Sequence, residues 1–407
     1  MTAARVAAAL AGQLSRTLGL GAGQNVAGRL ALRWEPEILG ELSRSRVTLL
    51  VSGTNGKTTT TRMLAEVVAL TRPVVSNATG SNLQPGLVAA LLGADEGTTA
   101  VLEVDEVVLP AALAACKPSV VALLNLSRDQ LDRTSEVAGH AGRWLAALRA
   151  DDRCTIVANA DDPTIVHAVR QARGERAGIL WVGAGQPWRD DAAVCPACGS
   201  AWDATLEDWS CCHCGARRPT PDWQLRDGRA LAHGVDVPLD LQLPGRANQA
   251  NAIMALAAAA ALGIKPEVAL PALRELSTVE GRYARTQVGN RDVRLLLAKN
   301  PAGWQELLHP EDALASRVII AFNAREADGR DPSWLYDVPL GLLRKRQVVV
   351  VGERATDVSV RLHYAGVEHR TAVDLRQALS MLPSGDVDVV ANYTAFTKVR
   401  RSLARRA

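Results

Sequence analysis

The 407-residue sequence has no long hydrophobic run and no strong excess of charge of either sign. Its longest apolar stretch, "AIMALAAAAALGI" (252–264), is shorter than the roughly 20 residues that a membrane-spanning helix needs. The net charge of +3 gives no electrostatic support for nucleic-acid binding by the chain as a whole. Residues 1–20 are interrupted by Gln13, Ser15 and Arg16, which indicates an amphipathic helix rather than a signal peptide. We therefore expect a soluble, cytoplasmic protein.

Lysine is scarce, since only six of the 46 basic residues are lysines. Codon usage is sufficient to explain this preference for arginine. Because lysine is scarce, Lys57 and Lys299 are notable, since each lies inside a motif. Hydrophobic residues make up 48% of the chain and charged residues 22%, which is a globular balance. A chain of this length is expected to form two or three domains.

Short β-branched runs alternate with helical patterns from residue 46 onward. Strands are expected at 46–52, 98–106, 118–126, 154–160 and 177–183, and helices at 57–70, 136–149, 162–172 and 246–262. Antiparallel strands are expected within 230–245, and strands of a second α/β unit at 293–299, 316–323, 347–352 and 387–392. Strands separated by helices favour a mostly parallel, doubly wound sheet. We divide the chain into an N-terminal helical segment (1–45), a central domain (46–284) and a C-terminal domain (285–407).

"GTNGKTTT" (53–60) follows an expected strand and opens an expected helix, which is the context of a phosphate-binding loop. Backbone N–H groups at a helix N-terminus attract phosphate oxygens. Lys57 is placed to reach the β- and γ-phosphates of ATP, and Thr58 to bind Mg²⁺ through its hydroxyl group. A plain glycine turn is the alternative. The expected ATP-binding residues here are Gly53, Thr54, Asn55, Gly56, Lys57, Thr58 and Thr59.

A magnesium site also needs a carboxylate at the end of a neighbouring strand. "VLEVDE" supplies Glu103, Asp105 and Glu106. Glu103 is our first choice, because it comes directly after the apolar run and is expected at the carboxyl end of the strand. Asp105 and Glu106 remain candidates for the magnesium ligand. The alternative is that these carboxylates are solvated residues at a strand end.

Five of the seven cysteines lie within residues 195–214. Cys195-x-x-Cys198 and Cys211-x-x-Cys214 are two pairs, each followed by glycine, and this spacing predicts a Cys₄ zinc ribbon inserted at about 190–220. Cys212 offers an alternative partner for Cys214, but the spacing of the first pair favours Cys211. A closed Cys₄ shell leaves no position for chemistry, so we expect the Zn²⁺ to be structural.

The phosphate loop has only two residues between Gly53 and Gly56, and in this it resembles the ATP-dependent Mur ligase family, which includes folylpolyglutamate synthases. The resemblance implies that a carboxylate is phosphorylated and that an amine then attacks the acyl phosphate. "LNLSRDQLDR" (124–133) resembles a family segment in which Gln130 stands where histidine is common. "LPGRANQANAIMAL" (243–256) resembles its adenine-binding motif, which implies roles for Asn248 and Asn251, and Arg282 is implied to lie near the ribose.

About 45 residues precede the loop strand, so the family's domain for UDP-linked precursors is expected to be absent. This feature, the zinc ribbon and the stretches "LAKNPAGW", "ADGRDPSWLYD" and "ANYTAF" resemble the MurT branch of the family. That branch implies a ligase subunit of lipid II isoglutaminyl synthase with a glutamine amidotransferase partner, GatD, in a heterodimer. Lys299 and Asn300 are implied to face the reacting groups, although Lys299 could also be a plain surface lysine.

The expected reaction is amidation of the D-glutamate α-carboxylate of the lipid II stem peptide to D-isoglutamine, at the inner face of the membrane. Neither Cys116 nor Cys154 has the sequence context of a glutaminase nucleophile, so a separate subunit is expected to supply ammonia. The resemblance implies that Asp331 completes a Cys–His–Asp arrangement in that partner, while Asp328, Asp331 and Asp337 could each be turn formers.

Two other functions remain open. The first is an amino-acid-adding ligase of the folylpolyglutamate synthase type, which needs no glutaminase. The second is a non-catalytic ATP-binding protein whose zinc ribbon binds nucleic acid, for which Arg217 and Arg218 beside the ribbon are the supporting residues. Salt-dependent binding to DNA or RNA would favour it.

Overall fold

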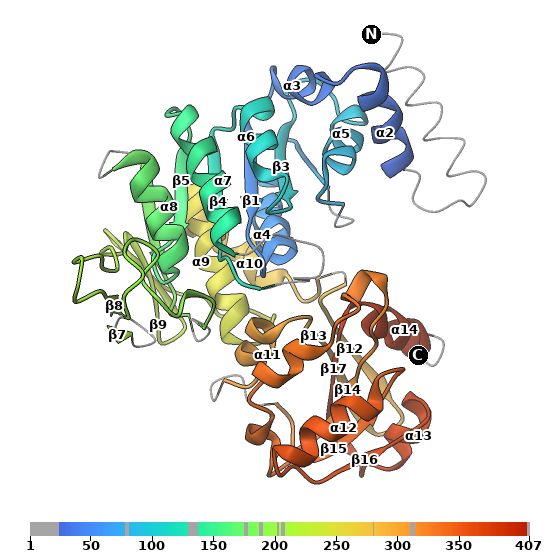
Figure 1. Ribbon diagram of the computed structural model, residues 1–407. Helices are drawn as coiled ribbons and strands as arrows, with labels where there is room; N and C mark the ends of the chain where they lie inside the picture. The colour runs from blue at the N-terminus through green and yellow to red at the C-terminus, as the bar shows by residue number, and fades with distance from the viewer. Residues whose placement is uncertain are drawn as a thin grey trace. The chain divides into compact units, whose positions relative to one another are not determined.

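The computed structural model describes residues 24–77, 81–128, 137–174, 178–186, 190–201, 203–204, 208–279, 281–309 and 314–404 (Figure 1). Gln130 and residues 1–23 of the expected N-terminal segment lie outside these ranges. The chain forms two compact units, and each is described by itself. The first unit consists of residues up to Leu276, apart from two short segments at 127–136 and 243–246. The second unit consists of these two segments and the residues from Ser277 onward. The division falls a few residues before the boundary predicted from the sequence.

The first unit contains a nine-stranded sheet in the order β11-β10-β9-β6-β5-β4-β1-β3-β2. Its strands are β1 (Thr48–Ser52), β2 (Val74–Ser76), β3 (Thr99–Val104), β4 (Val120–Leu123), β5 (Thr155–Asn159), β6 (Ile179–Gly183), β9 (Trp223–Arg226), β10 (Arg229–Ala232) and β11 (Val235–Pro238). From β2 to β9 the neighbouring strands are parallel, and β9, β10 and β11 pair antiparallel. The sequence predicted this parallel α/β arrangement.

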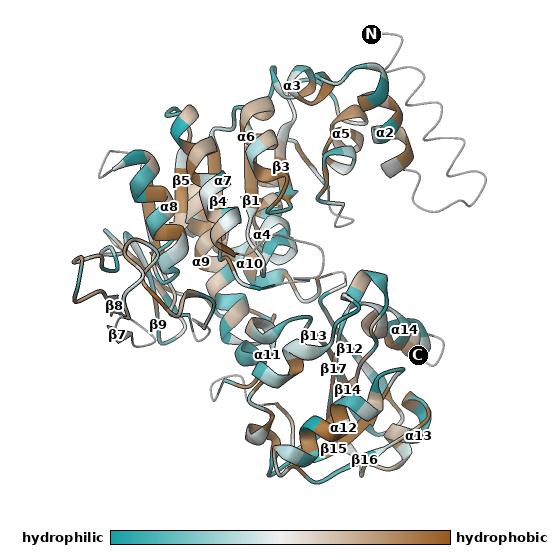
Figure 2. Cartoon of the chain, viewed as in Figure 1, coloured by the Kyte–Doolittle hydropathy of each residue, from teal (hydrophilic) through white to brown (hydrophobic). Residues whose placement is uncertain are grey.

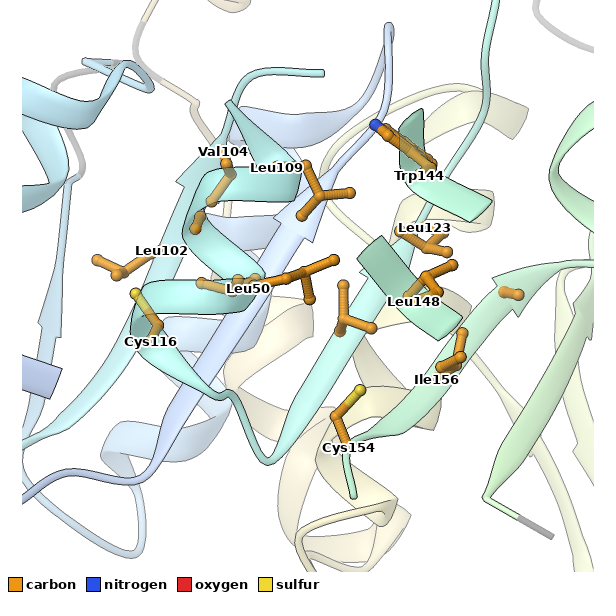
Figure 3. Close-up of a cluster of buried hydrophobic side chains, with 14 of the residues drawn as sticks. Leu50, Leu102, Val104, Leu109, Cys116, Leu123, Trp144, Leu148, Cys154 and Ile156 are labelled. Carbon is orange, nitrogen blue, oxygen red and sulfur yellow. The ribbon is translucent and has the colours of Figure 1, made fainter. Parts of the chain in front are cut away.

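Helices cover the sheet on both faces, because its central strands are mostly apolar and do not alternate with exposed polar residues. β1, β3 and β4 are buried at every position, which is typical of parallel strands with both faces covered. The helices are α2 (Gln24–Trp34), α3 (Ile38–Ser43), α4 (Lys57–Ala69), α5 (Gln84–Leu92), α6 (Leu109–Cys116), α7 (Val137–Ala150), α8 (Pro163–Arg173), α9 (Arg246–Ala260) and α10 (Pro266–Glu275). Figure 2 shows hydrophobic residues concentrated in the central strands, and Figure 3 shows strand residues such as Leu50 and Leu123 packed with Leu109 of α6 and Trp144 of α7.

The cysteine-rich insert lies between β6 and β9 and contains the short antiparallel pair β7 (Asp203–Ala204) and β8 (Trp209–Ser210). The insert does not interrupt the sheet, because β6 pairs directly with β9 on either side of it. The sequence did not reveal β2, β7, β8 or β9, which have only two to four residues each. Strands this short carry too little periodicity to be recognised.

The second unit contains a six-stranded sheet in the order β12-β13-β17-β14-β15-β16. Its strands are β12 (Tyr283–Val288), β13 (Arg291–Leu297), β14 (Arg317–Ala321), β15 (Gln347–Val351), β16 (His369–Thr371) and β17 (Gly385–Ala391). β12 and β13 form an antiparallel hairpin, and the remaining pairs are parallel. β12 spans the domain boundary that was expected between residues 284 and 285, and it was not predicted as a strand. Its side chains are partly buried or exposed, so they lack the apolar run of a buried strand.

Two apolar clusters fill the second unit, one including Phe396 and Leu379, the other Trp304, Phe322 and Leu343. Its helices are α11 (Pro301–Leu307), α12 (Ala355–Tyr364), α13 (Leu375–Ser380) and α14 (Tyr393–Ala404), with short 3₁₀ turns η3 (Glu326–Asp328), η4 (Ser333–Asp337) and η5 (Leu340–Leu343). Among the described residues, no helix has the length and apolar character needed to cross a membrane.

Candidate functional site

The phosphate loop connects β1 to α4 and has a backbone that only glycine allows at two positions. Gly53 and Gly56 have φ angles of 147° and 84°. A Cβ atom at Gly53 would lie 2.9 Å from the backbone nitrogen of Asn125, and one at Gly56 would collide with the side-chain oxygen of Asn251. Gly56 caps α4 without a side-chain hydrogen bond. The first N–H groups of this helix are therefore suited to phosphate oxygens.

Asn125 fixes the conformation of the loop from the neighbouring strand end. Its carbonyl oxygen accepts from the Thr54 N–H at 2.9 Å, and its side-chain oxygen accepts from the Asn55 N–H at 2.8 Å. Its amide group donates to the Asn55 carbonyl oxygen at 3.0 Å. Asn125 belongs to the stretch 124–133, but it was not among the site residues predicted from the sequence. Its position directly after β4, beside β1, is the signal that could have identified it.

Lys57 is buried at the first position of α4. Its ammonium group donates to the carbonyl oxygen of Gly53 at 2.5 Å and lies 2.7 Å from Oε2 of Glu106. Burial lowers the pKa of Lys57, but the charges of Glu106, Asp105 and Glu103 outweigh burial, and the net shift is upward. The lysine therefore stays protonated and presents a buried positive charge at the loop.

The three candidate carboxylates have different surroundings. Glu106 pairs with Lys57, whereas Glu103 is 1% exposed within β3 and accepts a hydrogen bond from the side chain of Asn82 at 3.1 Å. Asn77 holds the backbone of Glu103 through two hydrogen bonds of 2.8 Å. All three carboxylates act electrostatically on Lys57. The oxygen atoms of these carboxylates and of the hydroxyl groups of α4 are donors that suit Mg²⁺, and the buried lysine beside them suits a nucleotide phosphate.

Helix α9 brings Asn251 to the phosphate loop. The Asn251 side-chain oxygen accepts from the Thr60 hydroxyl at 3.2 Å and faces Gly56. Asn248 lies one turn earlier on the same helix, at a spacing that shares one helix face. Thr58 and Thr59 lie in the first turn of α4 and are nearly buried.

Two consecutive aspartates, Asp161 and Asp162, follow β5 and contact different segments. Asp161 pairs with Arg218 of the insert, and Asp162 binds the segment that follows β4. Asp162 caps α8 by accepting from the N–H groups of Thr164 and Ile165, and its second oxygen accepts from the Leu126 N–H at 2.8 Å. Burial raises the pKa of Asp162 to about 6, although these hydrogen bonds act in the opposite direction. Asp162 was not among the site residues predicted from the sequence.

Four cysteines converge in the insert. The sulfur atoms of Cys195 and Cys214 are 3.6 Å apart, those of Cys198 and Cys211 are 3.5 Å apart, and all four lie within 4.8 Å of one another. Sulfur atoms around a tetrahedral zinc at 2.3 Å would be about 3.8 Å apart. The donor set therefore fits a closed zinc site.

The two cysteine loops have the same backbone geometry. In the first, the Cys195 carbonyl oxygen accepts from Gly199, and in the second, the Cys211 carbonyl oxygen accepts from Gly215. Both glycines have positive φ angles, 75° and 72°. The structure brings Cys211 into the cluster, whereas Cys212 is exposed and lies outside it.

The insert is attached to the core through Trp209 and Arg218. The Trp209 indole donates to the carbonyl oxygen of Ala160 at 3.1 Å, and Arg218 forms an ion pair of 2.7 Å with the buried Asp161. The Arg218 side chain is only 11% exposed. This arginine is therefore not available to bind a nucleic-acid phosphate.

In the second unit, polar residues gather after the carboxyl ends of β14 and β17. The backbone N–H of Asn323 donates to the side chain of Asn392 at 3.1 Å, and the Asn392 amide donates to the Asn323 carbonyl oxygen. Asp328 is 5% exposed and accepts from both the backbone N–H and the hydroxyl group of Thr394. This network joins the "ADGRDPSW" and "ANYTAF" stretches, which lie far apart in the sequence.

The expected residues of the second unit lie in distinct local settings. Asn300 is buried and caps α11 by accepting from Gly303 at 2.8 Å, and Lys299 precedes it at half-buried exposure. Arg282 lies in the turn before β12. Asp331 is exposed and accepts from the N–H and hydroxyl groups of Ser333, which is the Asx turn expected of an aspartate near proline. Asp337 forms an exposed ion pair with Arg128.

Each unit of the chain matches a model of a Mur ligase domain. Residues 51–193 match the Mur ligase middle domain, and residues 297–396 match the MurT ligase C-terminal domain. The chain is 27% identical to the lipid II isoglutaminyl synthase (glutamine-hydrolyzing) subunit MurT of Streptococcus pneumoniae, over 95% of this chain and 94% of that protein. It is also 27% identical to the corresponding MurT subunit of Staphylococcus aureus strain COL, over 98% of this chain and 96% of that protein.

Solved structures support the same fold. A pseudomurein peptide ligase type C from Methanothermus fervidus matches with a TM-score of 0.68 at 18% identity, covering 88% of this chain and 79% of that chain. MurF from Acinetobacter baumannii matches with a TM-score of 0.68 at 16% identity, covering 93% of this chain and 80% of that chain.

Proposed function

Because the chain is a member of the Mur ligase family with a MurT-type C-terminal domain, we propose that it is the ligase subunit of a lipid II isoglutaminyl synthase. In this function it amidates the D-glutamate α-carboxylate of the lipid II stem peptide to D-isoglutamine, and it consumes ATP. The observation that carries the proposal is the phosphate loop with buried Lys57, in a chain that is similar to MurT subunits over almost its whole length.

The chemistry requires activation, because a carboxylate is anionic and has no leaving group. A carboxylate oxygen attacks the γ-phosphorus of ATP, and ADP leaves. Ammonia then attacks the carbonyl carbon of the acyl phosphate, inorganic phosphate leaves, and a proton is lost to give the amide. Magnesium, when bound, would neutralise phosphate charge, and Thr58 and Glu103 are the residues proposed to hold it.

Lys57 is proposed to place a fixed positive charge beside the phosphate groups of ATP, where negative charge shifts between oxygen atoms during phosphoryl transfer. In the structure this charge is balanced by Glu106, at 2.7 Å. The N–H groups after Gly56 provide further donors that need no reorganisation during the reaction. Asn248, Asn251 and Arg282 are proposed to bind the nucleoside, and Lys299 and Asn300 to act near the reacting groups.

A separate glutaminase is proposed to supply the ammonia. Cys116 and Cys154 are both buried, and burial raises the pKa of the Cys116 thiol to about 11, so it is not a thiolate at neutral pH. The cysteines that remain belong to the insert. A GatD-like amidotransferase, in a heterodimer with this chain, is therefore the proposed partner, and Asp331 is proposed to orient a histidine in it.

The structural zinc site is proposed to rigidify the first unit rather than to take part in chemistry. The four clustered thiols support a closed shell without an open coordination position. Trp209 and Arg218 attach the shell to residues that directly follow β5.

The test is reconstitution of amidation with purified protein. The chain, lipid II, ATP and Mg²⁺ are incubated with ammonium chloride, or with glutamine and a GatD-type amidotransferase. The expected result is the mass decrease that accompanies conversion of the stem peptide's carboxylic acid to a carboxamide. Addition of an amino acid instead would favour the folylpolyglutamate-type ligase, a function that the similarity to MurT subunits does not support.

A further inference from the structure

A hollow of about 800 Å³ opens at the amino-terminal ends of β15 and β16 in the second unit. It lies at the edge of the sheet opposite to the Asp328 network, because that network follows the carboxyl ends of strands parallel to β15. Four of its lining residues have basic side chains, namely Arg346, His363, His369 and Arg370. Glu368 is the one acidic residue of the lining.

The positive charge at this hollow is not neutralised within the described part of the chain. Arg346 and Arg370 donate to backbone carbonyl oxygens, and so does Arg344, which lies beside Gly366 of the lining. Among the described residues, no carboxylate forms an ion pair with these arginines or with Lys345, in contrast to the paired Arg294 of the same unit. These hydrogen bonds fix the guanidinium groups in place and leave their charge for an external anion.

Exposed apolar side chains stand next to these cations. Tyr364 is 77% exposed at the end of α12, and its ring contacts the ring of His363 in the lining. Leu342 is 53% exposed, and its carbonyl oxygen accepts from Arg346 at 2.8 Å. Basic side chains beside an exposed tyrosine and an exposed leucine match the two layers of a membrane surface, where phosphates lie above acyl chains.

We propose that this hollow and its rim, formed by 342–346, 363–364 and 366–370, bind the phosphate groups of anionic phospholipids. The proposal rests on the proposed function in one respect, because a lipid-linked substrate requires the protein to work at a membrane. A basic groove for nucleic acid would be extended and lined by several stacking aromatic rings. This hollow is local and has one exposed tyrosine at its rim.

The test is cosedimentation of the full-length protein with vesicles. Vesicles of phosphatidylcholine are compared with vesicles in which part of the lipid is phosphatidylglycerol, in the absence of substrate and ATP. The expected result is binding to the anionic vesicles that weakens as salt is raised. The variants Lys345→Gln and Arg370→Gln should each bind about fivefold more weakly, since one basic residue near an anionic surface contributes about that factor.

Lys265→Gln is the matched control, because Lys265 is an exposed lysine in the first unit and the substitution removes the same charge. Equal binding to both vesicle types, or equal loss in Lys345→Gln and Lys265→Gln, would overturn the proposal. Binding of inorganic phosphate or of a labelled oligonucleotide without vesicle binding would also overturn it and assign the hollow to a soluble ligand. Amidation of detergent-solubilised lipid II with ammonium chloride does not require vesicles, so its outcome tests the proposed function separately.

Discussion

The ammonium group of Lys57 lies 2.7 Å from a carboxylate oxygen of Glu106, and the two side chains are only 6% and 12% exposed. The lysine begins α4, and the glutamate follows β3 by two residues. A buried cation at the start of a phosphate-binding loop needs an anion while no phosphate is present. Glu106 therefore occupies the electrostatic position that a nucleotide phosphate is proposed to take.

Glu106→Gln should destabilise the nucleotide-free protein by about 1 to 3 kcal/mol, because a buried charged hydrogen bond is lost. Mg·ATP should recover much of this loss, since phosphate oxygens replace the missing carboxylate near Lys57. Chemical denaturation with and without Mg·ATP measures both effects. Glu66→Gln is the control, because Glu66 pairs with Arg62 on the exposed surface of α4, where such a change costs less than about 1 kcal/mol.

Lys57→Ala, Thr58→Ala and Glu103→Ala should each lower amidation by about a hundredfold or more, even when ammonium chloride replaces glutamine. Activation of the carboxylate precedes any use of ammonia, so the nitrogen source cannot rescue these variants. Rates of ADP release and of amide formation are the measurements. An active Glu103→Ala together with an inactive Glu106→Ala would move the proposed magnesium ligand from Glu103 to Glu106.

The purified protein should contain one zinc ion per chain, and Cys195→Ser or Cys198→Ser should remove it. Loss of the metal should lower the thermal midpoint, because metal binding and folding of a small insert are coupled. Cys211→Ser should behave in the same way, whereas Cys212→Ser should retain metal, since Cys212 lies outside the cluster. Metal analysis and thermal unfolding check this, and full stability without metal would contradict it.

Asp162 should make stability depend on pH between about 4 and 6. Its folded pKa, about 6, is raised by burial above the ordinary value of 3.8. A carboxyl with a raised folded pKa contributes stability that is present below pH 4 and is lost as pH rises through 6, in total about 3 kcal/mol. Asp162→Asn removes this titration. The difference in unfolding free energy between wild type and variant should change across this window, and a constant difference would contradict the assignment.

Asp331→Asn should abolish glutamine-dependent amidation and largely spare amidation with ammonium chloride. Asp331 is exposed, and its carboxylate accepts hydrogen bonds from the N–H and hydroxyl groups of Ser333, so its remaining lone pairs are accessible to a partner. Asp328→Asn is the contrasting variant, because it disrupts a buried network and should destabilise the second unit. Equal loss with both nitrogen sources in Asp331→Asn would show that Asp331 serves the ligase site or folding.

The sequence alone was enough to predict the types of most elements and their parallel arrangement. Buried runs such as "TLLVS" and "TAVLEV", separated by helical patterns, are local signals that burial on both faces of a sheet produces. It also predicted the backbone geometry of the loop at 53–57 and of the two cysteine loops, because short motifs with fixed spacing bring their own backbone geometry. Gly53, Gly56, Gly199 and Gly215 all adopt the positive φ angles that these motifs require.

The contacts between side chains of different elements could not be predicted from the sequence. Spacing could not show that Glu106 rather than Glu103 contacts Lys57, because this depends on how the turn after β3 approaches the loop after β1. It could not show that Asn125 holds the loop, or that Asp328 is buried against Thr394 while Asp331 is exposed. Secondary-structure patterns record which face of an element is buried, whereas pairings between distant residues follow from strand order and turn geometry.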